Sequence, residues 1–344
     1  MRRLTLGFVV ICLLAACRQA PLYRQEAFVF GTRVELLIAG LSEAEARPAA
    51  AEVFREFDRL HRTYHAWKPS ELSALNDALA AGKSQQVSPE LADLLRDAQR
   101  WALAGEQLFD PGIGRLVALW GFQSDDLPEA PPDADALAAW QAARPGIAAL
   151  QVDAGRYVRS KQRQLAIDFG GYLKGVALDR AAALLHAGGV NNALINIGGN
   201  VMALGSKNGE AWRVGIQHPR RPGPLATLAM ADGEAIGTSG DYQRYFERDG
   251  KRYCHLLDPR NAQPVMHTQA LTVLISPRPS AGTLSDVASK PLFIAGSDWP
   301  RLARRMDVTD VLRVDAQGRV QVSGTLHARL EYVGSEPAAL EILR

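Results

Sequence analysis

The chain has 344 residues, which is enough for one large domain or two ordinary ones with a buried core. Hydrophobic residues make up 47% of it and charged residues 22%, the proportions of a globular protein. The net charge is only +2 at pH 7. Nucleic acid is therefore excluded as a partner, because binding to its phosphates requires a strongly basic surface.

The first sixteen residues differ from the rest of the chain. Arg2 and Arg3 precede an uninterrupted apolar run, residues 4–16, which is too short to span a bilayer and has the length of a signal-peptide core. Removal of this segment leaves 37 basic residues against 37 acidic ones. The sequence therefore predicts an exported protein whose mature chain is neutral.

The signal ends in LLAAC, where the small residues Ala15 and Ala16 precede Cys17. This pattern resembles the lipobox of bacterial lipoproteins. The resemblance implies cleavage before Cys17, acylation of its sulfur and of the new amino terminus, and a membrane-anchored protein that faces the periplasm. An ordinary secretory signal with an incidental cysteine is the alternative, and Arg18 leaves both the inner and the outer membrane open.

The mature chain is expected to form one domain. We predict a signal peptide over residues 1–16, a linker over residues 17–27 and a single domain over residues 28–344. Cys12 leaves with the signal and Cys17 is lipidated, so Cys254 remains as the one thiol. No internal disulfide is then expected.

The first part of this domain is predicted to be two strands followed by helices. Residues 28–38 have the pattern of a strand, a Gly-Thr break and a second strand, and residues 41–60 that of an amphipathic helix. Ser70 is placed to cap a short helix. A further helix is predicted between Pro89 and Gly105, which are typical start and stop residues.

The motif FDPGIGRLVALWGF predicts another helix, with Asp110 as its N-cap and Pro111 at its first position. Apolar residues follow at helical spacing, namely Ile113, Leu116, Val117 and Trp120. Residues 123–145, rich in Ala, Pro and Asp, are expected to be a surface excursion that contains one helix.

The second half of the chain alternates strands, a helix and hairpins. LAIDFGG is predicted to be a strand that runs into a glycine turn, and residues 172–187 a helix. ALINIGGNVMALG is a strand with another glycine turn. Asp249-Gly250 should join two strands in a hairpin, and VLRVDAQGRVQVSG should form a second one. This mixture predicts an α+β fold.

The stretch DFGGYLKG places a carboxylate, two glycines and a lysine where the strand pattern gives way to the helical one. Backbone N–H groups at a helix start attract anions, and Lys174 could contact the same anion. Asp168 would repel a bare phosphate, but it fits if a cation lies between them or if it accepts a ring N–H. A glycine turn with a capping Asp and a surface Lys is the alternative.

Five motifs together resemble the ApbE family, in the family's order. They are HRTYHAWKPSELSALN, FDPGIGRLVALWGF, IDFGGYLKGVALDR, NALINIGGN and AIGTSGDYQRYFERDGKRYCHLLDPRNAQPV. The resemblance covers residues 28 to about 296 and implies an α+β fold related to the T-fold. It also implies an FAD:protein FMN transferase, which cleaves FAD, attaches FMN through a phosphoester to a Ser or Thr hydroxyl of an extracytoplasmic redox protein, and releases AMP.

The resemblance further implies the residues of the site. The cofactor contacts would be Phe30, Tyr64, Phe109, Asp110, Pro111, Asp168, Lys174 and Leu257. Tyr64 would stack on the isoalloxazine ring, with core packing as the alternative. The Gly171 carbonyl would bind a magnesium ion that bridges the FAD diphosphate. His255 would assist proton transfer as a catalytic residue, or be a structural histidine.

The helix that should complete the metal site departs from the family. The family has Asp and, four residues later, Thr; this chain has Asp286, expected to be both catalytic and a metal ligand, and then Lys290. Positions i and i+4 share a helix face, so Asp286 and Lys290 should meet as an ion pair. Charged lysine has no lone pair, and Pro291 should kink or stop the helix. Ser289 could supply an oxygen to a weakened metal site, the Lys290 ammonium could take the cation's place, or catalysis could be lost. Ala262, where glycine is common, is a smaller departure.

Three other functions stay open on the sequence. The chain could bind FAD with little or no transferase activity, or it could be an FAD pyrophosphatase if water attacks in place of a hydroxyl. A lipoprotein interaction module that uses no flavin belongs to a third class.

Overall fold

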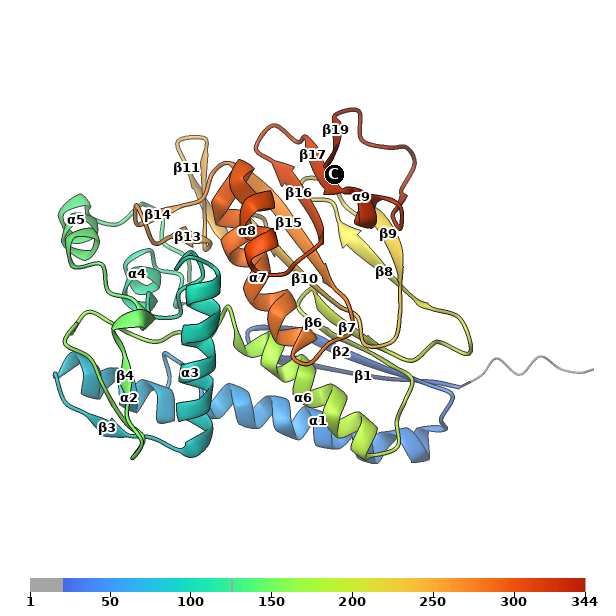
Figure 1. The fold of residues 1–344 in the computed structure, drawn as a ribbon, viewed down its shortest axis with the longest axis horizontal. Coiled ribbons are helices and arrows are strands. Elements are labelled where there is room, and N and C mark those ends of the chain that lie inside the picture. Colours follow the sequence, from blue (N-terminus) through green and yellow to red (C-terminus); the bar gives the residue numbers. More distant parts are fainter. Residues whose placement is uncertain (1–20, 125, 344) are drawn as a thin grey trace, which may run out of the picture.

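A nine-stranded sheet forms the centre of the protein in the computed structural model, which describes residues 21–124 and 126–343 (Figure 1). Its strands, in spatial order, are β1 (Leu22–Val29), β2 (Thr32–Ala39), β6 (Ala193–Ile197), β7 (Asn200–Leu204), β10 (Ala235–Gly240), β15 (Thr268–Ile275), β16 (Asp310–Asp315), β17 (Val320–Ser323) and β19 (Leu340–Leu343). Only β17 and β19 pair in parallel in this sheet. Strands from both ends of the described chain share the sheet, and with the packed helices they confirm the α+β prediction.

The sheet begins earlier than the sequence predicts. β1 pairs with β2 from Leu22 opposite Ala39 to Val29 opposite Thr32, so residues 22–27 belong to the fold and the linker prediction is wrong for them. The turn between the strands lies at Phe30 and Gly31, which both have positive φ angles, 56° and 69°. Cys17 and the predicted signal peptide lie outside the described residues.

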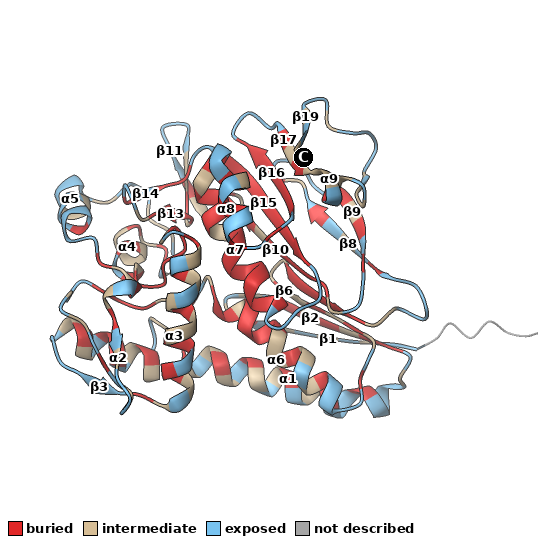
Figure 2. Ribbon diagram, in the orientation of Figure 1, coloured by how far each residue is buried: buried red, intermediate tan, exposed pale blue. Residues whose placement is uncertain are grey.

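The helices cover one face of the sheet and extend beyond its edge, except for the short helix Gly324–His327, which packs on the other face (Figure 1). They are α1 (Glu43–Thr63), α2 (Glu71–Ala80), α3 (Pro89–Ala104), α4 (Gly114–Leu119), α5 (Ala134–Ala143), α6 (Leu173–Ala187), α7 (Ala281–Ala295), α8 (Trp299–Arg305) and α9 (Gly324–His327), with 3-10 turns at Ile147–Ala149 and Gly296–Asp298. α7 contacts β10 and β15 on one side and α6 and α8 on others. It is buried along nearly its whole length (Figure 2), so a charged side chain on it must find a partner inside the protein.

Local capping explains where the first helices begin. The Glu45 carboxylate accepts the backbone N–H of Ser42 (2.8 Å) at the start of α1. The Ser70 hydroxyl accepts the Ser73 N–H (3.0 Å), which confirms the predicted cap of α2. α3 begins at Pro89 and ends before Gly105, as its sequence predicts.

α7 differs from its prediction because it runs through Pro291 to Ala295. Pro291 cannot donate a backbone N–H to the carbonyl one turn earlier, so the helix loses one hydrogen bond there. The proline ring is buried, and its Cβ and Cγ lie 3.2 Å from where a Cβ on Gly105 would be. Packing against α3, α6 and the sheet offsets the lost hydrogen bond, so the helix does not stop.

Smaller sheets complete the fold. β8 (Trp212–Gln217), β9 (Pro224–Met230) and β18 (Glu331–Tyr332) pack on the other face of the large sheet, and β3 (Gln85–Gln86), β4 (Gln151–Val152) and β5 (Tyr157–Arg159) lie beside α2 and α3. Two hairpins, β11 (Tyr245–Arg248) with β12 (Lys251–Cys254) and β13 (Leu257–Asp258) with β14 (Gln263–Pro264), lie near α4. The first has the predicted Asp249-Gly250 turn, with φ angles of 51° and 70°. The second predicted hairpin is also confirmed, as β16 and β17.

Candidate active site

The start of α6 and the middle of α7 meet around the carboxylate of Asp286. This side chain is fully buried, and its Oδ2 accepts the backbone N–H of Gly175 (2.9 Å). Gly175 permits the contact because any Cβ there would lie 2.6 Å from the Gly282 carbonyl oxygen and 2.7 Å from the Cβ of Asp286. The helix start is thereby fixed to a negative charge on α7.

Lys290 lies one turn after Asp286 on the same face of α7. Its Nζ donates to the backbone carbonyl of Asp286 (2.6 Å) and also to the carboxylate Oδ1. The lysine side chain is 15% exposed, whereas Asp286 is fully buried. Burial and the nearby Lys174 lower the pKa of Lys290, and Asp286 opposes this effect. The predicted i, i+4 ion pair is thus confirmed.

The stem of Lys290 fills the space over the glycine loop before α6. A Cβ on Gly171 would lie 2.8 Å from the Cε of Lys290 and 3.0 Å from its Cδ. Gly171 is therefore adjacent to the lysine that replaces the expected threonine. Ser289 faces the sheet: its hydroxyl donates to the Asp286 carbonyl (2.9 Å) and lies 2.8 Å from the Ser239 hydroxyl of β10.

Asp168 is held at the other side of this loop. Its backbone N–H donates to the Pro111 carbonyl (2.8 Å), and its Oδ1 accepts the Gly170 N–H (2.7 Å). Buried Asn76 fixes the preceding residue, since its side chain bonds both the N–H and the carbonyl of Ile167 (2.7 and 2.9 Å). Burial raises the pKa of Asp168, and hydrogen bonds from Gly170 and the Trp67 side chain oppose the rise.

Asp110 is not the N-cap of a helix, and that prediction is wrong. α4 begins at Gly114, and the Oδ1 of Asp110 accepts the N–H groups of Gly112 (2.7 Å) and Ile147 (2.9 Å). The carboxylate therefore joins this turn to a segment 37 residues later, which helical spacing alone does not reveal. Burial raises the pKa of Asp110 to about 6. Pro111 and Asp110 still lie next to Asp168 through the Pro111 carbonyl.

His255 and the basic side chains share one electrostatic environment. Burial, together with the charges of Lys174, Lys290 and Arg244, lowers the pKa of His255 to about 4, although its hydrogen bond with the Arg244 backbone opposes the shift. The Nδ1 of His255 lies 3.1 Å from the Arg244 carbonyl oxygen. A carbonyl only accepts, so Nδ1 carries the proton and Nε2 is left as an acceptor near neutral pH.

Replacing His255 with alanine is expected to lower turnover by about 10²-fold or more, the usual contribution of a general base, while FAD affinity stays nearly constant. At saturating FAD, the wild-type turnover should fall only as the pH drops towards about 4, where Nε2 gains a proton. Steady-state rates over pH and FAD titrations by fluorescence quenching measure both effects. Equal losses of affinity and turnover would reject the catalytic role.

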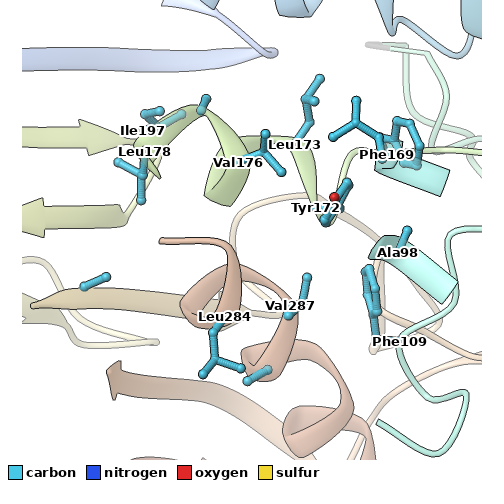
Figure 3. Close-up of a cluster of buried hydrophobic side chains, with 14 of the residues drawn as sticks. Ala98, Phe109, Phe169, Tyr172, Leu173, Val176, Leu178, Ile197, Leu284 and Val287 are labelled. Carbon is cyan, nitrogen blue, oxygen red and sulfur yellow. The ribbon is translucent and has the colours of Figure 1, made fainter. Parts of the chain in front are cut away.

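The predicted flavin contacts lie in and around the apolar core next to this loop. Phe109 is buried, and its ring lies 3.7 Å from where a Cβ on Gly171 would be. Tyr64 is also buried, with its ring edge-on to Phe169 (6.4 Å between centroids), which is the packing alternative left open by the sequence. Figure 3 shows Phe109, Phe169 and Tyr172 around the start of α6.

Two further predicted contacts lie at the edge of this region. Phe30 packs edge-on against Phe57 of α1 at 6.0 Å. Leu257 is buried in a separate apolar cluster with Trp120 and Phe246. The smaller departure at Ala262 is a buried residue with a φ of 60°, a conformation that favours glycine.

The structure therefore brings together most of the predicted polar site. Asp168, Gly171, Lys174, His255, Asp286 and Ser289 surround the start of α6. A separate cavity of about 630 Å³ lies on the β8 side of the large sheet, and no predicted site residue lines it.

The sequence analysis missed Trp67, Arg244 and Ser239. Trp67 is 36% exposed, and its side-chain hydrogen bond lowers the pKa of Asp168. The charge of Arg244 lowers the pKa of both Asp168 and His255. Trp67 and Arg244 lie inside motifs already singled out, in HAWKPS and YQRYF. A large aromatic two positions before Pro69 was the available signal for Trp67, while the contact of Ser239 with Ser289 depends on tertiary packing.

Known proteins resemble this chain in sequence over most of its length. The sequence profile of the ApbE family matches residues 30–312. An FAD:protein FMN transferase of Rhodobacter capsulatus is 41% identical over 326 residues, which are 94% of this chain and 61% of that relative. One from Klebsiella pneumoniae is 34% identical over 253 residues, 72% of each chain. The chain thus spans somewhat less than two thirds of the Rhodobacter protein.

Solved structures are similar over almost the whole chain. A crystal structure of the ApbE protein from Thermotoga maritima has a TM-score of 0.81 at 28% identity, covering 90% of this chain and 99% of that one. The flavin transferase ApbE from Vibrio cholerae has a TM-score of 0.77 at 25% identity with the same coverage. The fold defines an α+β protein with the architecture of the solved ApbE proteins. The chain belongs to the ApbE family.

Proposed function

We propose that this chain is an FAD:protein FMN transferase. The observation that carries the proposal is the meeting of Lys174, His255 and the Asp286–Lys290 pair at the start of α6, in a member of the ApbE family. Ammonium groups form strong charge-assisted hydrogen bonds with phosphate oxygens, and Lys174 and Lys290 place two such groups near the start of α6. A dinucleotide with a linked diphosphate is the kind of ligand that such a site favours.

The proposed reaction forms one phosphorus–oxygen bond and breaks another. The Ser or Thr hydroxyl oxygen of an acceptor protein attacks the FMN-side phosphorus of FAD. The bond from this phosphorus to the bridging oxygen breaks, and AMP leaves with that oxygen and its electron pair. The hydroxyl proton passes to the free Nε2 of His255, while the Lys174 ammonium binds phosphate oxygens.

The residues present do not fit the magnesium ion that the family resemblance implies. Asp286 is already bonded to Lys290 and Gly175, and the stem of Lys290 lies against Gly171. The Ser289 hydroxyl faces Ser239 and the Asp286 carbonyl. A divalent ion needs several free oxygen ligands around one point, so no step of the reaction is assigned to it.

Mass spectrometry separates this function from its alternatives. We expect the purified chain, given FAD and a redox domain with an accessible threonine, to add the mass of FMN less water to that domain and to release AMP. The same domain with threonine replaced by valine should stay unmodified. Free FMN with AMP would indicate a pyrophosphatase, intact bound FAD an inert flavin-binding protein, and a protein that never quenches flavin fluorescence an interaction module.

We further propose that the protein is exported and held at a membrane, facing the periplasm, by lipid on Cys17. Its support is the sequence: two arginines, the apolar run over residues 4–16 and the small residues before Cys17. In the part of the chain that the structure describes, no helix is long and apolar enough to cross a membrane. Replacing Cys17 with serine should move the protein from the membrane to the soluble fraction; unchanged membrane association would contradict the anchor.

A further inference from the structure

The cation next to Asp286 is part of the chain itself. The Lys290 ammonium is joined to the carboxylate and to the carbonyl of Asp286, two groups held by a buried helix. An ammonium has three N–H donors, and these two contacts use two of them. The third donor is available to a ligand oxygen, and the lysine side chain as a whole is 15% exposed.

The surroundings direct this ammonium towards an anion. Lys174 lies close enough to lower the pKa of Lys290 through its charge, and no ion-pair partner of Lys174 occurs among the described residues. Two ammonium groups therefore repel each other in this region, where Asp286 balances the charge of one of them. A bound diphosphate relieves this repulsion, because its oxygens carry negative charge between the two groups.

The same lysine occupies the space that a divalent ion would need. Its Cδ and Cε lie against Gly171, and its Nζ donates a hydrogen bond to Oδ1 of Asp286, which is then not available to a metal. A metal could bind there only if Lys290 were displaced into solvent and lost both hydrogen bonds. The chain thus carries its own single positive charge, that of Lys290, at the place where the family resemblance implies a doubly charged magnesium ion.

We propose that the Lys290 ammonium is the resident cation of this site, that it binds the FAD diphosphate directly, and that the chain needs no divalent metal for binding or transfer. The proposal rests on the proposed transferase function. In the reaction, the ammonium offsets negative charge as the bond to the bridging oxygen breaks, so AMP leaves without a metal bridge. It undergoes no covalent change.

The experiment compares FAD binding and FMN transfer in excess EDTA and in excess magnesium. For the wild-type chain we expect FAD affinity, followed by fluorescence quenching, and transfer rate to agree within about twofold between the two conditions, since the cation is built in. Titration of magnesium into the FAD-free protein, followed by isothermal titration calorimetry, should give no heat of binding. These measurements need no variant and so do not depend on the folding of one.

Two variants extend the test. Lys290→Met should weaken FAD binding about tenfold or more in both conditions, the scale of one charge-assisted hydrogen bond. Lys290→Thr should be equally weak in EDTA and regain affinity with magnesium, because the threonine hydroxyl restores an oxygen ligand beside Asp286. Lys83→Met, an exposed lysine at the end of α2, should match the wild type.

The outcomes distinguish this inference from the proposed function. If the wild type binds FAD and transfers FMN only with magnesium, the transferase stands and the built-in cation is wrong. Wild-type affinity in Lys290→Met in EDTA would also overturn it. A wild-type chain that neither binds nor cleaves FAD in either condition overturns both proposals.

Discussion

Replacing Asp286 with asparagine is expected to lower the free energy of unfolding by about 3 kcal/mol, the lower end of the cost of breaking a buried ion pair. Asp286 is fully buried, and its carboxylate accepts hydrogen bonds from Lys290 and from the Gly175 amide. Asparagine keeps the volume but leaves the ammonium without a counter-charge. The lower end applies because Lys290 is 15% exposed and so retains some hydration. Urea denaturation followed by circular dichroism measures the change.

A double variant provides the control for this result. Asp286→Asn combined with Lys290→Met removes the unpaired ammonium, and it should be more stable than Asp286→Asn alone. A double variant with the summed loss of the two single variants would mean that the two side chains do not interact. In that case the ion pair would not stabilise the contact between α6 and α7.

Replacing Lys174 with methionine is expected to weaken FAD binding about 10- to 100-fold, the scale of a charge-assisted hydrogen bond of about 1.5–3 kcal/mol. Methionine keeps most of the apolar stem and removes only the charge. In the absence of FAD, the variant should be no less stable than the wild type, because Lys174 repels Lys290 and has no ion-pair partner among the described residues. Flavin fluorescence titration and thermal unfolding without ligand measure the two effects.

A loss of FAD affinity without a loss of stability is the result that identifies a ligand-binding lysine. A structural lysine would lose stability when replaced, and a solvent lysine would change neither quantity. Lys83→Met serves again as the matched control, since Lys83 is exposed and far along the sequence from the site. Unchanged FAD affinity in Lys174→Met would contradict the proposed phosphate contact.

Local features of the fold were predicted well because they depend on residues close together in the chain. The Ser70 cap, the start of α3 at Pro89 and the Asp249-Gly250 turn each use side chains or φ angles within a few residues. The Asp286–Lys290 pair belongs to the same class, because i and i+4 share a helix face. Predicting these features required only the geometry of a single helix or hairpin.

Predictions failed where distant packing outweighed a local signal. Pro291 is a helix breaker by itself, yet α7 continues through it because the proline packs against Gly105, directly after α3, and the helix is buried along nearly its whole length. Asp110 has the sequence of an N-cap, yet its carboxylate binds the Ile147 amide of another segment. Residues 22–27 resemble a linker, yet β2 pairs with them.

The sequence by itself determined the α+β class, the family resemblance and the candidate residues of the site, because motif residues keep their identity whatever surrounds them. Only the tertiary structure decided where the charged groups of the site lie relative to one another. Gly175 and Asp286 are 111 residues apart, and Lys290 meets Gly171 only because α7 packs against α6. The place of an ammonium relative to a carboxylate and a glycine loop is set by that packing, and electrostatic energy depends on those distances.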